Sequence, residues 1–94
     1  MKVIIDNCLF CNKSLFSLNI DYLYCNNRKC EYICRVYGDI LELEKNDLCL
    51  TYSFLTNKIE ISFEYSLKGE YFLDSSLEDL KQIFLNYESN LIFM

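Results

Sequence analysis

Alternation of apolar and polar side chains along the first two thirds of the chain predicts β-strands. In residues 15–24 every second position is apolar or aromatic, and Ser17, Asn19 and Asp21 lie between. Residues 58–67 show the same period of two most cleanly, as expected for a strand with one buried and one solvated face. The predicted strands are residues 15–24, 31–37, 40–44, 48–55, 58–67 and 70–73.

Short polar segments between these strands predict turns. They are residues 25–30 (CNNRKC), Asn46-Asp47, Thr56-Asn57 and Lys68-Gly69. Because connections of this length cannot cross over a sheet, neighbouring strands should be antiparallel.

The apolar period changes to three and four in the C-terminal tail, which predicts a helix within residues 75–91. Ser75 followed by Glu78 resembles a capping box, so the helix should start near Ser76. One apolar stripe runs along it, formed by Leu77, Leu80, Phe84, Tyr87 and Leu91. The expected fold class is mainly β (α+β), a small antiparallel sheet with one C-terminal helix packed on it.

A chain of 94 residues fits a single domain, residues 1–94, with one small core. It divides into a cysteine-rich part (1–37), a strand-rich part (38–73) and the helix (75–91). Asp6 interrupts the first apolar run, so no signal peptide is expected, and no stretch approaches the about 18 apolar residues of a membrane span. We therefore expect a cytoplasmic protein without membrane contact, whose thiols stay reduced.

Four cysteines have the spacing of a zinc site. Cys8-x2-Cys11 and Cys25-x4-Cys30 are two close pairs separated by thirteen residues. Zinc binds four thiolates tetrahedrally, and a tight turn carrying two cysteines supplies one edge of that tetrahedron. The sequence therefore predicts a structural Zn²⁺ held by Cys8, Cys11, Cys25 and Cys30, that is, an N-terminal zinc ribbon.

The polar residues of CNNRKC fit a ligand loop. Asn26 and Asn27 tolerate the left-handed backbone that a turn without glycine is expected to need. Arg28 and Lys29 would offset the net negative charge of a four-thiolate zinc centre.

Other interpretations of the cysteines stay open. The six cysteines could form a disulfide framework, CLFC could be a redox motif, or the thiols could be chemically idle core residues. Cys34 and Cys49 lie inside apolar runs and are interpreted as buried side chains, although Cys34 could replace Cys30 in another register.

Residues 8–32 resemble the zinc ribbons at the C-terminal end of type IA topoisomerases. The likeness consists of CLFCNKSL, a strand, and YLYCNNRKCEYI, whereas the proline and glycine usual in that family's loops are absent. The resemblance implies single-stranded DNA binding by aromatic and basic side chains. The residues that could form such a surface are Phe10, Lys13, Phe16, Tyr22, Tyr24, Arg28, Lys29, Tyr32 and Arg35.

The charge distribution favours a different partner. Residues 1–37 hold five basic and three acidic side chains, whereas residues 38–94 hold four basic and eleven acidic ones. Such an acidic body repels nucleic acid, so the expected partner is a protein with a basic surface, met by carboxylates such as Glu60 and Glu64. The carboxylates Glu42, Glu44, Glu60 and Glu64 alternate on strands as an outward face does, and they are interpreted as solvated and not as a metal site or an acid pair.

No catalytic motif is present. The chain has no histidine, no GxSxG and only two glycines. The sequence therefore predicts a non-enzymatic protein-interaction module of the inhibitor, immunity or phage accessory kind. Single-stranded nucleic-acid binding through the ribbon, with Arg28 and Lys29, is the alternative.

Overall fold

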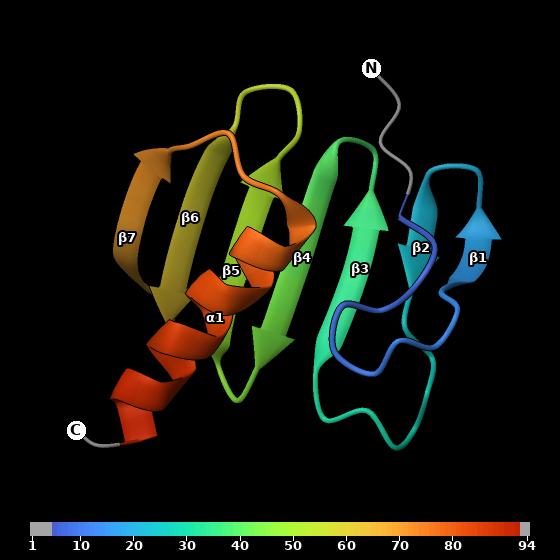
Figure 1. Ribbon diagram of the computed structural model, residues 1–94, viewed down its shortest axis with the longest axis horizontal. Coiled ribbons are helices and arrows are strands. Elements are labelled where there is room, and N and C mark those ends of the chain that lie inside the picture. Colours follow the sequence, from blue (N-terminus) through green and yellow to red (C-terminus); the bar gives the residue numbers. More distant parts are fainter. Residues whose placement is uncertain (1–4, 93–94) are drawn as a thin grey trace.

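The computed structural model describes residues 5–92, which form one sheet and one helix (Figure 1). The elements are β1 (Phe16–Asn19), β2 (Tyr22–Tyr24), β3 (Ile33–Tyr37), β4 (Ile40–Lys45), β5 (Leu48–Ser53), β6 (Lys58–Phe63), β7 (Ser66–Phe72) and α1 (Leu77–Ile92). Strand order in the sheet follows chain order from β1 to β7, and every neighbouring pair is antiparallel. The predicted mainly β fold class is confirmed.

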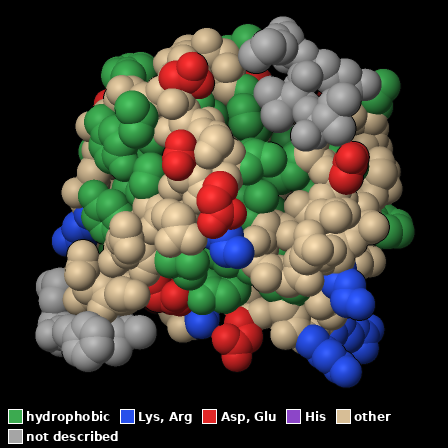
Figure 2. Space-filling model, viewed as in Figure 1, with side chains coloured by type: hydrophobic (Ala, Val, Ile, Leu, Met, Phe, Trp, Pro, Cys, Tyr) green, Lys and Arg blue, Asp and Glu red, His purple; other side chains and the backbone are tan. Residues whose placement is uncertain are grey.

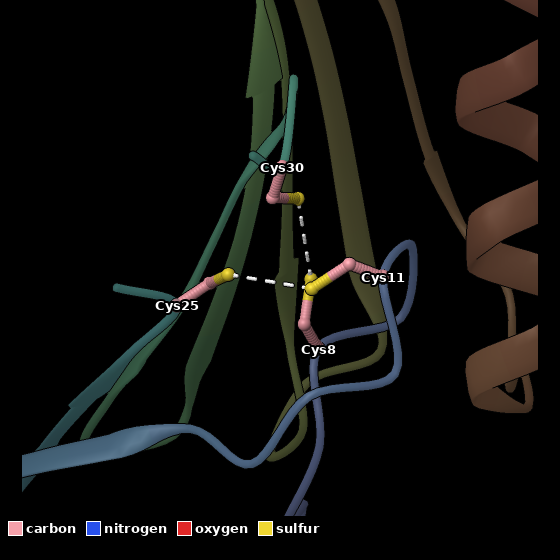
Figure 3. A group of neighbouring side chains, drawn as sticks. All are labelled: Cys8, Cys11, Cys25 and Cys30. Carbon is pink, nitrogen blue, oxygen red and sulfur yellow. Dashed lines mark hydrogen bonds between the residues drawn. The ribbon is translucent and has the colours of Figure 1, made fainter. Parts of the chain in front are cut away.

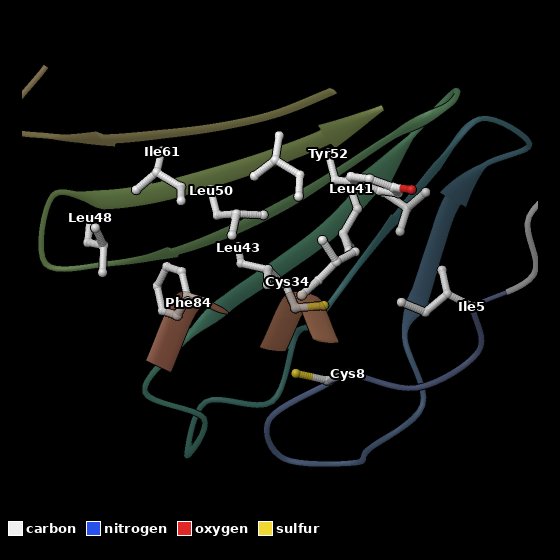
Figure 4. Close-up of a cluster of buried hydrophobic side chains, with 13 residues drawn as sticks. Ile5, Cys8, Cys34, Leu41, Leu43, Leu48, Leu50, Tyr52, Ile61 and Phe84 are labelled. Carbon is white, nitrogen blue, oxygen red and sulfur yellow. The ribbon is translucent and has the colours of Figure 1, made fainter. Parts of the chain in front are cut away.

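The hydrophobic core lies between the middle of the sheet and α1. Alternating side chains of the central strands point to the helix, and Leu80 and Phe84 of α1 meet them there (Figures 1 and 4). The buried sheet residues include Leu41, Leu43, Leu50, Ile59 and Ile61, each at most 1% exposed. The predicted apolar stripe of the helix is thus confirmed as the face that covers the sheet.

The opposite side of the sheet, which we call the open face, has no covering element among residues 5–92. The strand register aligns one residue from each strand in a single row across this face: Phe16, Tyr24, Arg35, Glu42, Thr51, Glu60 and Glu70. The row is aromatic on β1 and β2, ionic on β3 and β4, and acidic on β6 and β7.

The prediction of one strand over residues 15–24 was wrong, because this segment is a hairpin. The chain reverses at Ile20-Asp21, and β1 pairs with β2. The side-chain oxygen of Asn19 accepts a hydrogen bond from the Asp21 N–H at 2.8 Å, which is a local turn that competes with strand continuation. Ile20 lies at the tip and is 91% exposed.

The strand predicted over residues 58–67 is also shorter than expected. It ends at Phe63, and Glu64 and Tyr65 form a two-residue hairpin turn with φ of 51° and 66°. Both values lie in the left-handed region that such turns require. Alternation therefore continued in the sequence past the point where the backbone reverses.

The turn predicted at Lys68-Gly69 lies inside β7, so the strand predicted at residues 70–73 is instead Ser66–Phe72. Gly69 has a packing role there. A Cβ atom at this position would lie 2.7 Å from the hydroxyl oxygen of Tyr87 on α1. Glycine therefore permits the helix to approach the edge of the sheet closely.

The helix begins one residue later than predicted, at Leu77, because Ser76 is its N-cap. The Asp79 N–H donates to the Ser76 hydroxyl at 3.1 Å, and the Ser76 N–H donates to the Asp79 carboxylate at 3.2 Å. The reciprocal cap thus uses Ser76 and Asp79 in place of the predicted Ser75 and Glu78.

Candidate metal centre

The first pair of cysteines lies on a tight turn that precedes β1. The Cys8 N–H donates to the Lys13 carbonyl at 2.9 Å, and the Asn12 N–H donates to the Cys8 carbonyl at 3.0 Å. Asn12 has a φ of 62°, a left-handed value that asparagine tolerates better than most residues. The turn directs both thiols of the Cys8-x2-Cys11 segment toward the second loop (Figure 3).

The second pair lies on the loop between β2 and β3, where CNNRKC was predicted to turn. The Cys25 N–H donates to the Cys34 carbonyl at 2.9 Å, and the Cys30 N–H donates to the Asn27 carbonyl at 3.0 Å. The expected left-handed backbone at Asn26 and Asn27 was wrong, since neither has a positive φ. The Asn27 side chain shapes the loop by accepting the Lys29 N–H at 3.1 Å.

The two loops bring four sulfur atoms together. The thiols of Cys8, Cys11, Cys25 and Cys30 lie within 4.8 Å of one another (Figure 3). The Sγ atoms of Cys8 and Cys30 are 3.9 Å apart, and those of Cys11 and Cys25 are 3.7 Å apart. Cys8 is buried and the other three are partly exposed. These four side chains could hold a metal ion.

The two remaining cysteines lie outside this group. Cys34 is 1% exposed and belongs to the core under α1, as predicted. Cys49 lies on the open face and is partly exposed, so the prediction that it is buried was wrong in part. The four-sulfur group contains Cys30 and not Cys34.

The thiols of the group differ in how readily they ionise, because ionisation of one thiol disfavours ionisation of its neighbours. Burial disfavours the Cys11 thiolate, but hydrogen bonds from Asn27, from the Lys13 backbone and from neighbouring thiols outweigh it and lower the pKa of Cys11 to about 6. Burial, together with Cys11 and Cys8, raises the pKa of Cys25 to about 12. Burial also raises the pKa of Cys30. A bound cation would be needed to stabilise several thiolates here at once.

Aromatic packing fixes the cysteine loops against the helix. The rings of Phe10 and Tyr32 stack with centroids 4.1 Å apart, and both meet Phe84 of α1 edge-on. The Tyr32 hydroxyl donates to Glu88 at 2.8 Å, and the Lys45 ammonium lies 4.5 Å from the Tyr32 ring centroid. Phe10 and Tyr32 are therefore partly buried, and these contacts take up part of the ring surface that was predicted to stack on bases.

The predicted binding residues lie in two separate places. Arg28 and Lys29 are exposed on the loop between β2 and β3. Figure 2 shows a group of basic side chains at the lower right, where Figure 1 places that loop. Glu60 is on the open face and pairs with Lys58 at 2.9 Å, whereas Glu64 is exposed in the turn between β6 and β7.

Sequence reasoning missed an ionic cluster on the open face. Glu42 is only 9% exposed, so its interpretation as a solvated carboxylate was wrong. Arg35 Nε donates to it at 3.0 Å and the Tyr37 hydroxyl donates at 3.1 Å. Hydrogen bonding to Glu42 raises the pKa of Arg35.

Glu42, Glu44 and Cys49 could also be taken for a metal site, because their ligand atoms lie within 4.8 Å of one another. Arg35 already pairs with both carboxylates and supplies the positive charge there. No pattern along the chain indicated this cluster, since the three strands that build it come together only in the sheet.

Comparison of the chain with protein-family models, with curated proteins and with solved structures found no match. The resemblance to topoisomerase zinc ribbons stays a prediction that rests on the cysteine pattern. Within residues 5–92, α1 is the helix to consider as a membrane span, and it is neither long nor apolar enough.

Proposed function

We propose that Cys8, Cys11, Cys25 and Cys30 hold one structural Zn²⁺. Zinc–sulfur bonds of about 2.3 Å in a tetrahedron place neighbouring sulfurs about 3.8 Å apart. The two S···S distances of 3.7 and 3.9 Å agree with that edge. Four thiolates complete the coordination of zinc and leave no position for a reacting water, which supports a structural role over a catalytic one.

The metal would add a direct bond between two loops that otherwise meet through side-chain packing such as the stacking of Phe10 on Tyr32. The first loop precedes β1, at the edge of the sheet, and the second connects β2 to β3. Because β1 and β2 have only four and three residues, their ladder alone holds this end of the sheet weakly. A bound zinc would therefore contribute directly to folding of the N-terminal part.

We further propose that the chain acts by binding a protein with a basic surface, and that the open face is where it binds. The observation that carries this proposal is the row of seven residues across that face, which combines exposed aromatic surface with carboxylates. Phe16 is 47% exposed, and the Glu60 and Glu70 side chains are 44% and 43% exposed. Aromatic anchors beside charged groups are typical of protein interfaces.

Charge on the open face favours a cationic partner. Lys58 lies between Glu60 and Glu70, at 2.9 and 3.2 Å, so one positive charge faces two negative ones. Arg35 likewise faces both Glu42 and Glu44. Each cluster keeps one uncompensated carboxylate, and Glu64 at the neighbouring turn adds another. Basic groups of a partner would be attracted to this surface. An inhibitor, an immunity protein or a phage accessory factor of the cytoplasm could work in this way.

The zinc proposal is tested by elemental analysis of protein purified without added metal. We expect about one zinc per chain and release of four thiols on chelation. A chain that binds no metal, or one that carries iron, would overturn the proposal.

The partner proposal is tested by affinity purification from the source cells with three chains as bait. They are the wild type, the open-face variant Glu60→Lys/Glu70→Lys and a control variant. Asp74→Lys/Glu78→Lys is the matched control, since these two exposed carboxylates lie at the start of α1 and the change in charge is the same. A basic protein should copurify with the wild-type chain and the control, at low salt more than at high salt, and be lost with the open-face variant. Identical copurification with both variants would overturn the open face as the binding site.

Single-stranded nucleic-acid binding remains a second candidate because of one observation. Phe16, Tyr24, Tyr22 and Tyr37 form a continuous run of rings on the open face, with successive centroids 5.5, 5.7 and 6.4 Å apart. Bases could stack on such a run. A gel shift with a single-stranded oligonucleotide tests this idea, and Arg28→Glu/Lys29→Glu should abolish the shift. Absence of any shift at low salt would exclude it.

A further inference from the structure

The four cysteines of the candidate metal centre make contacts that bear on their oxidation. The Sγ atoms of Cys8 and Cys30 are 3.9 Å apart, and those of Cys11 and Cys25 are 3.7 Å apart. Each contact joins one cysteine of the first loop to one of the second (Figure 3). A disulfide at either contact would therefore connect the same two loops that a metal ion connects.

Backbone hydrogen bonds hold the loops in place independently of any metal. Within the first loop, the Cys8 N–H and carbonyl are bonded to Lys13 and Asn12, and the Phe10 N–H lies 3.4 Å from the Cys8 sulfur. In the second loop, Cys25 is bonded to the Cys34 carbonyl of β3. The stacking of Phe10 on Tyr32 adds a side-chain contact between the loops. The sulfurs should consequently stay close together in the reduced, metal-free chain.

Exposure differs among the thiols in a way that suits stepwise oxidation. Cys11, Cys25 and Cys30 are partly exposed, whereas Cys8 is only 2% exposed. Each contact pair thus contains at least one thiol that a small oxidant can reach and a partner that can react with it. Cys49 lies on the other face of the sheet and is separated from this chemistry. The Cys34 thiol interacts with that of Cys8, but at 1% exposed it is not accessible to an oxidant.

We propose that the centre is redox-responsive: hydrogen peroxide converts its four thiols into the disulfides Cys8–Cys30 and Cys11–Cys25, releases any bound metal, and leaves the two loops joined. For each bond, a thiolate takes one oxygen from the peroxide to give a sulfenic acid, with one water formed from the remaining oxygen and two protons. The partner thiol then displaces the sulfenic oxygen as a second water, and the disulfide forms. Two peroxides are reduced and four thiols are oxidised. Metal release rests on the proposed zinc site, whereas the disulfide pattern does not.

The consequence is a metal-free state that keeps the N-terminal part attached to the sheet. The alternative disulfides within each loop, Cys8–Cys11 and Cys25–Cys30, would not join the two loops to each other. Cross-links that close longer loops constrain the unfolded chain more. The oxidised, metal-free chain should therefore melt at least about 10 °C above the reduced, metal-free chain.

The test maps the disulfides. Metal-free, reduced wild-type chain is treated with hydrogen peroxide and then unfolded in denaturant that contains N-ethylmaleimide, which blocks the remaining thiols. The chain is digested with trypsin and chymotrypsin. Cleavage after Phe10 separates Cys8 from Cys11, cleavage after Lys29 separates Cys25 from Cys30, and cleavage after Tyr32 separates Cys30 from Cys34. Mass spectrometry should find Cys8 joined to Cys30 and Cys11 joined to Cys25, with the blocking group on Cys34 and Cys49. Within-loop disulfides, or any disulfide to Cys34, would overturn the proposal.

Two double variants provide a matched comparison. Cys8→Ser/Cys30→Ser leaves Cys11 and Cys25, which are in contact, whereas Cys8→Ser/Cys25→Ser leaves Cys11 and Cys30, one from each contact. Intramolecular oxidation should be several times faster in the first variant, and equal rates would contradict the assigned pairs. Zinc content of the untreated wild-type chain is measured separately. A chain without zinc but with the expected disulfide map would refute the zinc proposal alone.

Discussion

The hairpin turn at Glu64-Tyr65 provides a direct test of the backbone geometry. Both residues have left-handed φ values, 51° and 66°, and neither is glycine or asparagine. A left-handed conformation costs an ordinary L-residue roughly 1–2 kcal/mol. Tyr65 is 99% exposed, so its ring makes almost no packing contact that a substitution could remove. The double change Glu64→Asn/Tyr65→Gly should therefore stabilise the fold.

The expected magnitude is the sum of two gains and one cost. Glycine at residue 65 relieves the left-handed strain but costs roughly 0.5–1 kcal/mol in conformational entropy of the unfolded chain. Asparagine at residue 64 adds a few tenths, because Asn-Gly is the preferred pair in two-residue hairpin turns of this type. The sum is about 1 kcal/mol, which corresponds to a rise in Tm of about 4–8 °C for a chain of this size. Thermal melts followed by circular dichroism, at fixed metal content, measure it.

Tyr65→Ser is the matched control, because it removes the same exposed ring without giving the backbone the freedom of glycine. We expect this variant to melt within about 2 °C of the wild type. A lower Tm for Glu64→Asn/Tyr65→Gly would refute the reasoning and would mean that the native turn makes a stabilising contact of its own.

Three further changes test other parts of the fold. Burial, Glu42 and Glu44 raise the pKa of Cys49 from 9.0 to about 11, so stability should fall as pH rises from 9 to 11, where the unfolded chain loses this proton first. The urea midpoint of unfolding should fall less steeply with pH in Cys49→Ser than in the wild type. Parallel curves for the two chains would contradict the assignment. Arg35→Met should cost about 3 kcal/mol in denaturant unfolding because Glu42 is left buried and unpaired, whereas Arg35→Met/Glu42→Leu should recover most of that loss. Equal stability of these two variants would show that the pair is not coupled. Phe84→Ala removes a ring that is 1% exposed and should cost about 3–5 kcal/mol by chemical denaturation, and a loss below about 1 kcal/mol would mean that α1 does not depend on this contact.

The cysteine group illustrates what residue spacing can predict. Cys8-x2-Cys11 and Cys25-x4-Cys30 are each held by a local turn, and two turns at the same end of adjacent strands bring four thiols together. The spacing was sufficient because a ligand loop is set mainly by residues close in sequence. The buried pair of Arg35 and Glu42 shows the opposite case, since its partners lie on two strands and the burial of Glu42 depends on the whole sheet.

Turn positions were predicted well only where the turn residues differ from their neighbours. Asn46-Asp47 interrupts the apolar pattern and forms a left-handed turn with φ of 50° and 70°. Glu64-Tyr65 continues the alternation of β6, so the pattern gave no boundary there. Gly69 looked like a turn residue because glycine favours turns, but the close approach of Tyr87 explains it.

Periodicity and residue spacing were enough to predict the fold class, the antiparallel pairing of neighbouring strands, the helix that covers the sheet, and the grouping of four cysteines. Periodicity and spacing are local properties, and they record which face of each element is buried and which residues a turn brings together. The sequence did not predict which aromatic rings pack against α1, as Phe10 and Tyr32 do at Phe84, and which lie on the open face. Those positions depend on strand register and on the path of α1, which bring together residues far apart in the chain, and no local pattern encodes them.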